Sequence, residues 1–163
     1  YRYYRGELRR LYHPITITNA ICFSPDRRFA YYADTATAVV MRQALDSDDG
    51  WPTGSPEPWL DLSAEGLNPD GAVVDADGNF WNAQWGARRV ACYAPDATFL
   101  RSVAFPAAHT SCPAFGGPDL STLYCTSARQ GLSAETLAET PDHGRTFAVP
   151  GTARGQAEHQ VIL

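Results

Sequence analysis

Short apolar runs, separated by polar turns rich in Pro, Asp and Gly, follow one another along the chain. Between residues 68 and 86, two such runs flank an Asp-Gly turn. Gly78 supplies the positive φ that a tight hairpin turn needs. We therefore predict a brief buried strand at 73–74, a turn at 75–78 and an aromatic strand at 80–85. No segment keeps a long 3.6-residue periodicity, so the pattern predicts an all-β protein.

The same order of apolar strand, Pro/Asp turn and aromatic strand recurs at 23–34 and at 114–127. The aromatic residues Tyr32, Trp81 and Tyr124 would mark equivalent places in the three units. A repeat of about 40–50 residues with several short strands in each unit is typical of a β-propeller. We interpret the chain as about three blades of such a fold.

The other strands are expected at 20–23, 29–33, 38–44, 58–62, 88–94, 98–104, 111–115, 122–126, 145–149 and 160–163, with a hairpin at 1–12 and a weakly helical connection at 128–144. Residues 63–69 are predicted to be a loop that leads to Asp70 in a Pro-Asp-Gly turn. Because a few blades cannot close a ring and would leave unpaired edges, we expect residues 1–163 to be the C-terminal portion of a single β-propeller domain whose N-terminal blades are missing.

Composition limits the classes of reaction and ligand that the chain could use. The net charge is −5, and all 13 basic residues are Arg, which argues against nucleic-acid binding and removes lysine Schiff-base and Walker-lysine chemistry. No run is long enough to span a membrane. The four cysteines lie in apolar contexts without a C-x-x-C pair, so we interpret them as buried residues of a cytoplasmic, reducing compartment, with a cysteine nucleophile as the alternative.

The remaining candidates for chemistry are oxygen ligands, because G-x-S-x-G and H-E-x-x-H motifs are absent and the four His are scattered. Asn19 and Asp70 are each predicted just before the innermost strand of a unit, where a propeller has its central channel. Hard oxygen ligands there suit Ca²⁺, Mg²⁺ or Mn²⁺. Both side chains also suit a turn-forming role, since Asn and Asp bond readily to nearby backbone. Spacing alone leaves both interpretations open and favours the turn-forming one.

A set of motifs in the right order resembles the SMP-30/gluconolactonase/regucalcin family over nearly all of residues 15–130. The segments that carry this resemblance are Ile17 to Asp26, Tyr31 to Asp34, Asn68 to Gly71, Val74 to Trp81, Trp85-Gly86, Arg89-Val90, Thr110 to Cys112, Ala114 to Gly117 and Leu123 to Ala128. The sequence departs from the family pattern at Ala20, where Gly is common, and at Ala87-Arg88, where Gly-Gly is common.

The resemblance implies a six-bladed propeller with one divalent cation (Ca, Zn, Mg or Mn) in its channel, acting on a small sugar lactone in carbohydrate metabolism. It implies that Asn19 and Asp70 bind the metal and that Asp70 is the general base that activates water. The family's metal-binding Glu and its sugar-binding Arg and Asn lie upstream of the matched region. We therefore expect this chain alone not to supply a full metal shell.

Two alternatives stay open beside the metal-dependent sugar lactonase. One is a non-catalytic, calcium-binding or regulatory propeller. The other is a lactonase or esterase that acts on non-sugar substrates, in which Trp85 and His109 would line the pocket for substrate binding rather than serve packing. The sequence does not determine the lactone, the cation or the oligomeric state.

Overall fold

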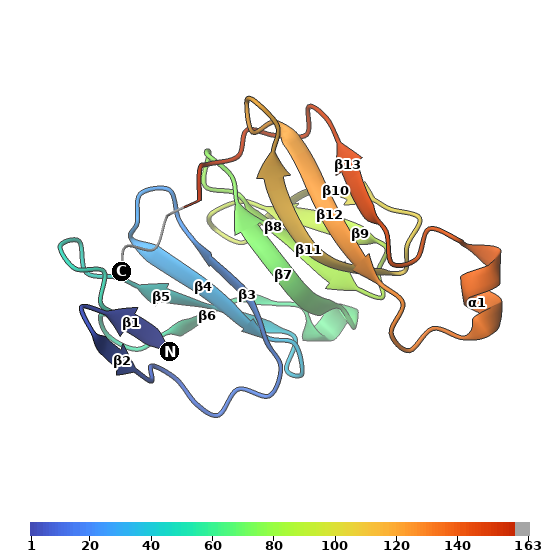
Figure 1. The fold of residues 1–163 in the computed structure, drawn as a ribbon. Helices are drawn as coiled ribbons and strands as arrows, with labels where there is room; N and C mark the ends of the chain where they lie inside the picture. The colour runs from blue at the N-terminus through green and yellow to red at the C-terminus, as the bar shows by residue number, and fades with distance from the viewer. Residues whose placement is uncertain (159–163) are drawn as a thin grey trace.

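The computed structural model describes residues 1–158, and nearly all its regular structure is β (Figure 1). The strands are β1 (Arg2–Tyr4), β2 (Glu7–Arg9), β3 (Thr18–Phe23), β4 (Phe29–Asp34), β5 (Val39–Ala44), β6 (Glu57–Asp61), β7 (Asn68–Val74), β8 (Phe80–Trp85), β9 (Arg89–Tyr93), β10 (Phe99–Ala104), β11 (His109–Gly116), β12 (Thr122–Ala128) and β13 (Thr146–Val149). A 3-10 turn, η1 (Ser63–Glu65), and one short helix, α1 (Ala134–Glu139), complete the described elements. Over residues 1–158 no helix has the length and apolar character needed to cross a membrane.

The strands from β3 onward form three antiparallel units. The first unit is the sheet β3-β4-β5-β6; the second unit is β7-β8-β9-β10; the third unit is β11-β12-β13. The bridge between His109 and Trp85 joins the second and third units into one seven-stranded, curled sheet. Successive units of antiparallel hairpins are consistent with a propeller-like fold. The prediction of an all-β, propeller-like chain is therefore confirmed.

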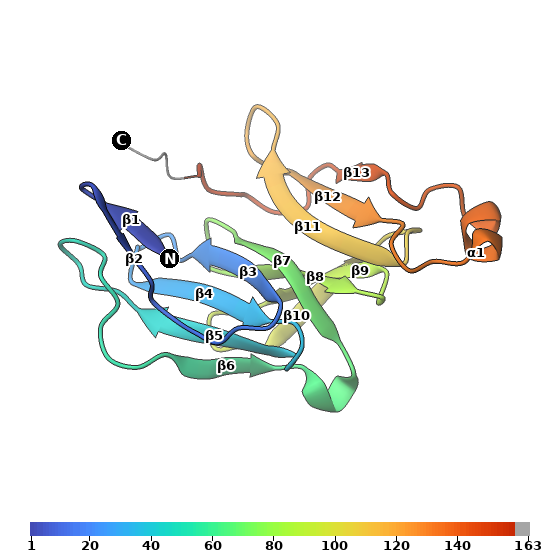
Figure 2. The ribbon, with the colours of Figure 1, turned by 60° about the horizontal axis from the view of Figure 1, so that its bottom comes forward.

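The first strands of the three units, β3, β7 and β11, lie side by side (Figure 2). Each contains a β-bulge at the same place: the pairing register breaks between Asn19 and Cys22, between Pro69 and Ala72, and between Thr110 and Pro113. A bulge leaves residues unpaired, bends the strand and redirects its side chains. The strand pairing is therefore interrupted at the same place in the inner strands β3, β7 and β11, and the candidate site lies around these bulges.

The second unit packs against both of its neighbours, because successive side chains of a strand point to opposite faces. Phe80 packs in the core cluster shared with the first unit, where its ring lies 5.5 Å from that of Tyr31. The next residue, Trp81, packs in the cluster shared with the third unit, 5.6 Å from the Phe115 ring. The aromatic run at 80–85, predicted as a strand, thus supplies both cores.

Three sequence expectations need correction or qualification. In the strand pairing, the residue of the first unit that is equivalent to Trp81 and Tyr124 is Ala30, not Tyr32. The predicted aromatic repeat is therefore two residues out of register in the first unit. The predicted turn at Asp70 is a bulge inside β7, which begins at Asn68. The strand expected at 160–163 lies outside the described residues.

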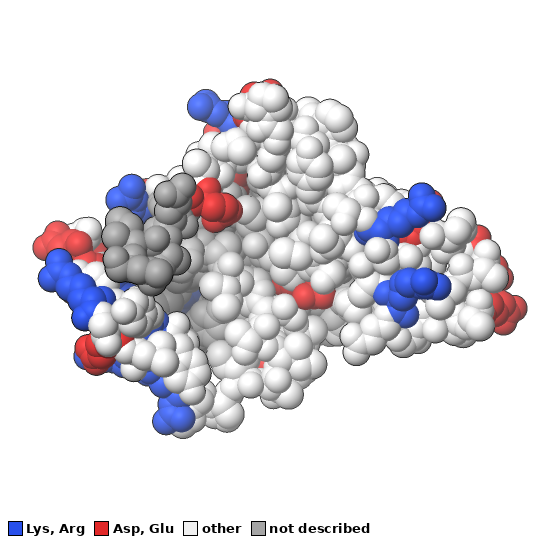
Figure 3. Space-filling model, viewed as in Figure 1, with Lys and Arg blue, Asp and Glu red and all other residues white. Residues whose placement is uncertain are grey.

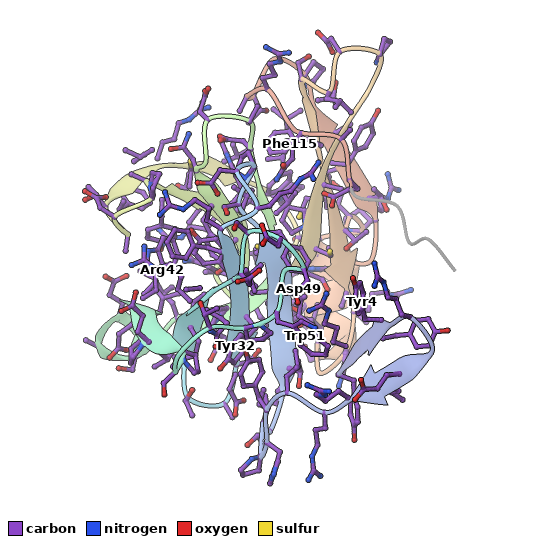
Figure 4. All side chains as sticks on the ribbon, turned by 90° about the vertical axis from the view of Figure 1, so that its left-hand side faces the viewer. Tyr4, Tyr32, Arg42, Asp49, Trp51 and Phe115 are labelled. Carbon is purple, nitrogen blue, oxygen red and sulfur yellow. The ribbon has the colours of Figure 1, made fainter. Side chains whose placement is uncertain are left out.

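The β1–β2 hairpin packs against the polar loop at 46–56 through Trp51 (Figure 4). The guanidinium groups of Arg2 and Arg9 lie 4.0 and 4.4 Å from the Trp51 ring centroid, and Arg2 also donates to the Asp49 carbonyl. Tyr4 meets the same indole edge-on at 6.2 Å. Charged side chains gather over this end of the molecule and over the end that carries α1, whereas the surface over β7 and β11 between them is mostly uncharged (Figure 3).

Residues 152–156, here called the strap, cross all three units at the end of the inner strands that lies away from the candidate site. The Gly155 amide donates to the Leu120 carbonyl of the third unit at 2.9 Å. The Gln156 side chain donates to the Val74 carbonyl of the second unit at 3.2 Å and to the Phe23 carbonyl of the first at 3.0 Å. The strap therefore holds the units together by contacts to their backbones.

Candidate functional site

Asp70 lies in the β7 bulge, and the buried side chain of Asn82 on β8 fixes the backbone there. The Asn82 amide nitrogen donates to the carbonyls of both Asp70 and Gly71, each at 3.1 Å. Because Asn82 is fully buried, water does not compete for these bonds. Asn82 thus holds the backbone of Asp70 and Gly71 in one conformation, which fixes the position from which the Asp70 side chain extends.

Gly71 lets β7 and β11 approach each other closely beside Asp70. A Cβ at this position would lie 2.8 Å from the Ser111 carbonyl oxygen and 2.9 Å from both the Cα and the Sγ of Cys112. Only glycine fits between these backbones without a shift. The close approach places Ser111 and Cys112, the bulge residues of β11, next to Asp70.

The Asp70 carboxyl is half-buried, and burial raises its pKa above the ordinary value of 3.8. Interactions with the Gly71 amide and the Ser111 side chain act in the opposite direction but do not cancel the effect. Burial raises the pKa of the Cys112 thiol, and the charge of the Asp70 carboxylate raises it further. The Cys112 thiol beside Asp70 is therefore uncharged. A bound cation would offset the free-energy cost of ionising the Asp70 carboxyl.

This shift predicts how the metal-free protein responds to pH. A carboxyl with a raised folded-state pKa stabilises the fold below its unfolded value of 3.8, and that stability is lost as the pH rises through the raised pKa. The asparagine side chain of the variant Asp70→Asn does not titrate. We expect Asp70→Asn to become progressively more stable relative to wild type across that pH window and to keep the advantage at neutral pH.

Urea denaturation of both proteins, freed of cations with a chelator, measures this difference at a series of pH values. A difference in unfolding free energy that does not change with pH across the window would contradict the assignment.

Asn19 lies on β3 next to this bulge, and its amide orientation is set by Thr35. The Asn19 Nδ2 donates to the Thr35 Oγ1 at 2.8 Å, and that hydroxyl donates to the Pro69 carbonyl at 2.7 Å. Asn19 and the peptide that precedes Asp70 thus contact the same hydroxyl. The structure brings the two predicted metal ligands onto neighbouring strands, linked by a residue that the sequence did not single out.

The two ligand candidates are not in equivalent register, contrary to the sequence expectation. Asn19 is the last paired residue before its bulge, equivalent to Pro69, whereas Asp70 is an unpaired residue of its bulge, equivalent to Ala20. Both also lie inside their strands rather than before them. Both strands have the bulge at the same place, so the two candidates occupy adjacent positions at the point where the alternation of side-chain directions is interrupted.

Both departures from the family pattern fall where the backbone is left-handed. Ala20 has φ of 56° and is buried, and Arg88 has φ of 58°. This conformation costs a non-glycine residue about 1–2 kcal/mol, which explains why glycine suits these positions. Arg88 donates to the Pro106 carbonyl, so its side chain helps to hold the turn between β8 and β9.

Trp85 and His109, the weaker candidates, form one contact at the same end of the inner strands. Their rings stack with centroids 4.1 Å apart and planes 14° from parallel. Trp85 also pairs with Asn68, two residues before Asp70. Burial lowers the pKa of His109, and the nearby His143 lowers it further. The pair is therefore a neutral aromatic platform beside the bulge, held by packing.

The donor set can be tested against a divalent cation. Within residues 1–158, the Asn19 Oδ1 accepts no hydrogen bond, and no group of three or more His, Cys, Asp or Glu side chains is arranged to hold a metal. A half-buried carboxylate and an amide oxygen turned away from its hydrogen-bonded nitrogen fit a hard cation. The described residues thus offer two suitable oxygen ligands, and a complete shell needs additional ones.

The chain is similar to known proteins over most of its length. The family model described as "SMP-30/Gluconolactonase/LRE-like region" matches residues 1–129. The chain is 43% identical over 153 residues to a putative sugar lactone lactonase of Rhizobium meliloti (strain 1021), covering 94% of this chain and 52% of that protein. It is 40% identical over 144 residues to the L-arabinolactonase of Azospirillum brasilense, covering 88% and 47%.

The crystal structure of a calcium-binding protein, regucalcin, from Agrobacterium tumefaciens str. C58 superimposes with a TM-score of 0.94 at 39% identity, covering 98% of this chain and 54% of that one. The chain therefore spans about half the length of these relatives. The family match covers the strands that carry Asn19, Asp70, Trp85 and His109. The chain belongs to the SMP-30/gluconolactonase/LRE-like family.

Proposed function

We propose that the protein containing this chain is a metal-dependent sugar-lactone hydrolase. The observation that supports this most directly is the half-buried Asp70 carboxylate on a rigid bulge, beside an Asn19 amide whose nitrogen is already committed to Thr35. The relatives named as lactonases, at 40% and 43% identity, support the same reaction class. We further propose that residues 1–163 are the C-terminal portion of a six-bladed propeller, since they span about half the length of those relatives.

In this proposal Asn19 and Asp70 are two of the ligands of one divalent cation. The bound cation would polarise the lactone carbonyl and stabilise the negative charge that develops on its oxygen. The Asp70 carboxylate accepts a hydrogen bond from the attacking water, orients it and takes its proton. Water adds to the carbonyl carbon, and the ring C–O bond breaks as Asp70 passes the proton to the leaving ring oxygen. The new carboxylic acid ionises at neutral pH and releases the second proton of the water.

Removal and return of the cation tests the proposal. We expect chelation to reduce hydrolysis of gluconolactone and pentonolactones to the spontaneous rate, because the carbonyl loses its Lewis acid, and one of Ca²⁺, Zn²⁺, Mg²⁺ or Mn²⁺ to restore it. Proton release after subtraction of the spontaneous rate is the measurement, and the longest natural protein that contains this chain is the sample. Full turnover after exhaustive chelation would refute metal dependence.

A second candidate is a calcium-binding propeller without turnover, favoured by the close superposition on a structure named as a calcium-binding protein. Calcium binding without hydrolysis of any lactone would favour it. A third candidate acts on non-sugar lactones or esters, favoured by the stacked Trp85 and His109, which present apolar surface beside the bulge. Faster hydrolysis of apolar lactones than of sugar lactones, and its loss in Trp85→Ala, would favour this third candidate.

A further inference from the structure

Thr35 occupies the turn between β4 and β5, outside every motif of the sequence, yet its hydroxyl bridges two neighbouring units. It accepts from the Asn19 Nδ2 at 2.8 Å and donates to the Pro69 carbonyl at 2.7 Å. Both directions are fixed by chemistry, because an amide nitrogen only donates and a carbonyl only accepts. The single hydroxyl proton is therefore committed to Pro69.

The backbone around Thr35 is held by Asp34. Its carboxylate accepts from the amides of Thr16 and Ile17, both at 2.9 Å, and from the amide of Ala36 at 3.1 Å. The Thr35 amide itself donates to the Ile17 carbonyl at 3.0 Å. These bonds fix the turn against the segment that leads into β3, so the Thr35 hydroxyl has a defined position relative to Asn19.

This arrangement selects one of the two orientations of the Asn19 amide. Rotation of the amide by half a turn would place Oδ1 against the Thr35 oxygen, which has no free proton to donate, and the contact would become repulsive. The observed orientation leaves Oδ1, the only atom of that amide able to bind a cation, on the opposite side. The same hydroxyl fixes the peptide that precedes Asp70, so one residue sets both candidate ligands.

We propose that Thr35 is the positioning residue of the metal centre, orienting the Asn19 amide for coordination and coupling β3 to the β7 bulge. This inference rests on the proposed metal-dependent function. Thr35 touches neither substrate nor cation in it and acts only through Asn19 and the Pro69 carbonyl. Groups that orient metal ligands from behind typically change cation affinity by about 10–100-fold when they are lost.

The test compares Thr35→Val, which keeps the shape and removes the hydroxyl, with Thr35→Ser, which keeps the hydroxyl. Thr37→Val is the matched control, because the Thr37 hydroxyl bonds within the same turn, to the Asp34 carbonyl at 3.1 Å. Calorimetric titration of the metal-free protein with Mn²⁺ or Ca²⁺ measures affinity. We expect Thr35→Val to weaken binding by about 10–100-fold, and Thr35→Ser and Thr37→Val to stay within about threefold of wild type.

Two further readouts separate positioning from general damage. The Asn19 side-chain NH₂ protons, followed by NMR, should exchange with solvent faster in Thr35→Val and remain protected in Thr35→Ser. Lactone turnover of Thr35→Val should recover at saturating cation, since the hydroxyl takes no part in the reaction itself. Wild-type affinity in Thr35→Val, equal weakening in Thr37→Val, or no rescue by Thr35→Ser would overturn the proposal.

Failure of the proposed function is distinguishable from failure of this inference. A wild-type protein that binds cation normally but hydrolyses no lactone refutes the function and leaves the affinity comparison as a test of Thr35. A wild-type protein whose Asn19 amide is protected through Thr35 but which binds no cation refutes the role of Thr35 at a metal centre.

Discussion

Asp70→Asn is expected to lower kcat for lactone hydrolysis by about 10²–10⁴-fold, the usual contribution of a positioned general base. Asparagine keeps the size of the side chain and an oxygen ligand, but it removes the negative charge and the site that takes the proton. Measurement at saturating cation separates this loss from weaker metal binding. Urea denaturation of both proteins at the same cation concentration shows whether unfolding contributes to the loss.

Asp96→Asn is the matched control for that experiment. Asp96 is an exposed turn aspartate whose carboxylate accepts from the Thr98 amide at 2.9 Å, far from the inner-strand bulges in the chain and on an outer turn of the second unit. Its replacement should leave kcat unchanged. Normal turnover in Asp70→Asn at every cation concentration would remove Asp70 from the reaction.

Asp75→Ala is expected to cost about 3–5 kcal/mol of folding stability, the largest loss we predict for a residue outside the site. Asp75 is only 1% exposed and accepts four hydrogen bonds: from the Asp77 amide at 3.0 Å, the Asn79 amide at 2.8 Å, the Asn79 side chain at 3.0 Å and the Trp81 Nε1 at 2.8 Å. Truncation leaves the fully buried Trp81 indole N–H without an acceptor.

Urea denaturation followed by tryptophan fluorescence measures that loss. Asp119→Ala provides the comparison, because Asp119 holds the turn between β11 and β12 through the Ser121 amide at 3.1 Å and hydroxyl at 2.8 Å but is exposed. Water replaces those bonds there, so the effect should be much smaller. An equal loss in the two variants would show that burial of the Asp75 network is not what stabilises this turn.

Local pattern is sufficient to predict most of the fold. The strand at 80–85 is predicted with the bounds that the structure has, because aromatic residues between an Asp-Gly turn and Gly86 leave few alternatives. The turn at Asp75 is predicted from Gly78, whose φ is 86°. These features depend on residues near in sequence, which is why the sequence reveals them.

The site is harder to predict because it depends on contacts between distant segments. Pro69-Asp70-Gly71 reads locally as a turn, yet the pairing of β7 with β8 and the close approach of β11 make it a bulge inside a strand. The one-residue offset between Asn19 and Asp70 is likewise visible only in the strand pairing. Thr35 carries no local signal, since its partner carbonyl lies 34 residues away.

The roles of Asn19 and Asp70 as metal ligands, and of Asp70 as the base, rest on the family resemblance. Physical reasoning from the residues alone favours a turn-forming role for both. The structure places both residues inside strands rather than in turns, and the proposed function builds on this.

The strap has a consequence for the order in which the molecule assembles. Within each unit, neighbouring strands are close in sequence, and apart from the β5–β6 and β12–β13 connections they are joined by short loops, so these hairpins close quickly. The bond from Gln156 to Phe23 spans 133 residues and requires all three units to be in place. We expect such a contact to form after the main folding barrier, so that it slows unfolding much more than it speeds folding. We therefore expect the strap to lower the unfolding rate of the assembled units while leaving their folding rate almost unchanged.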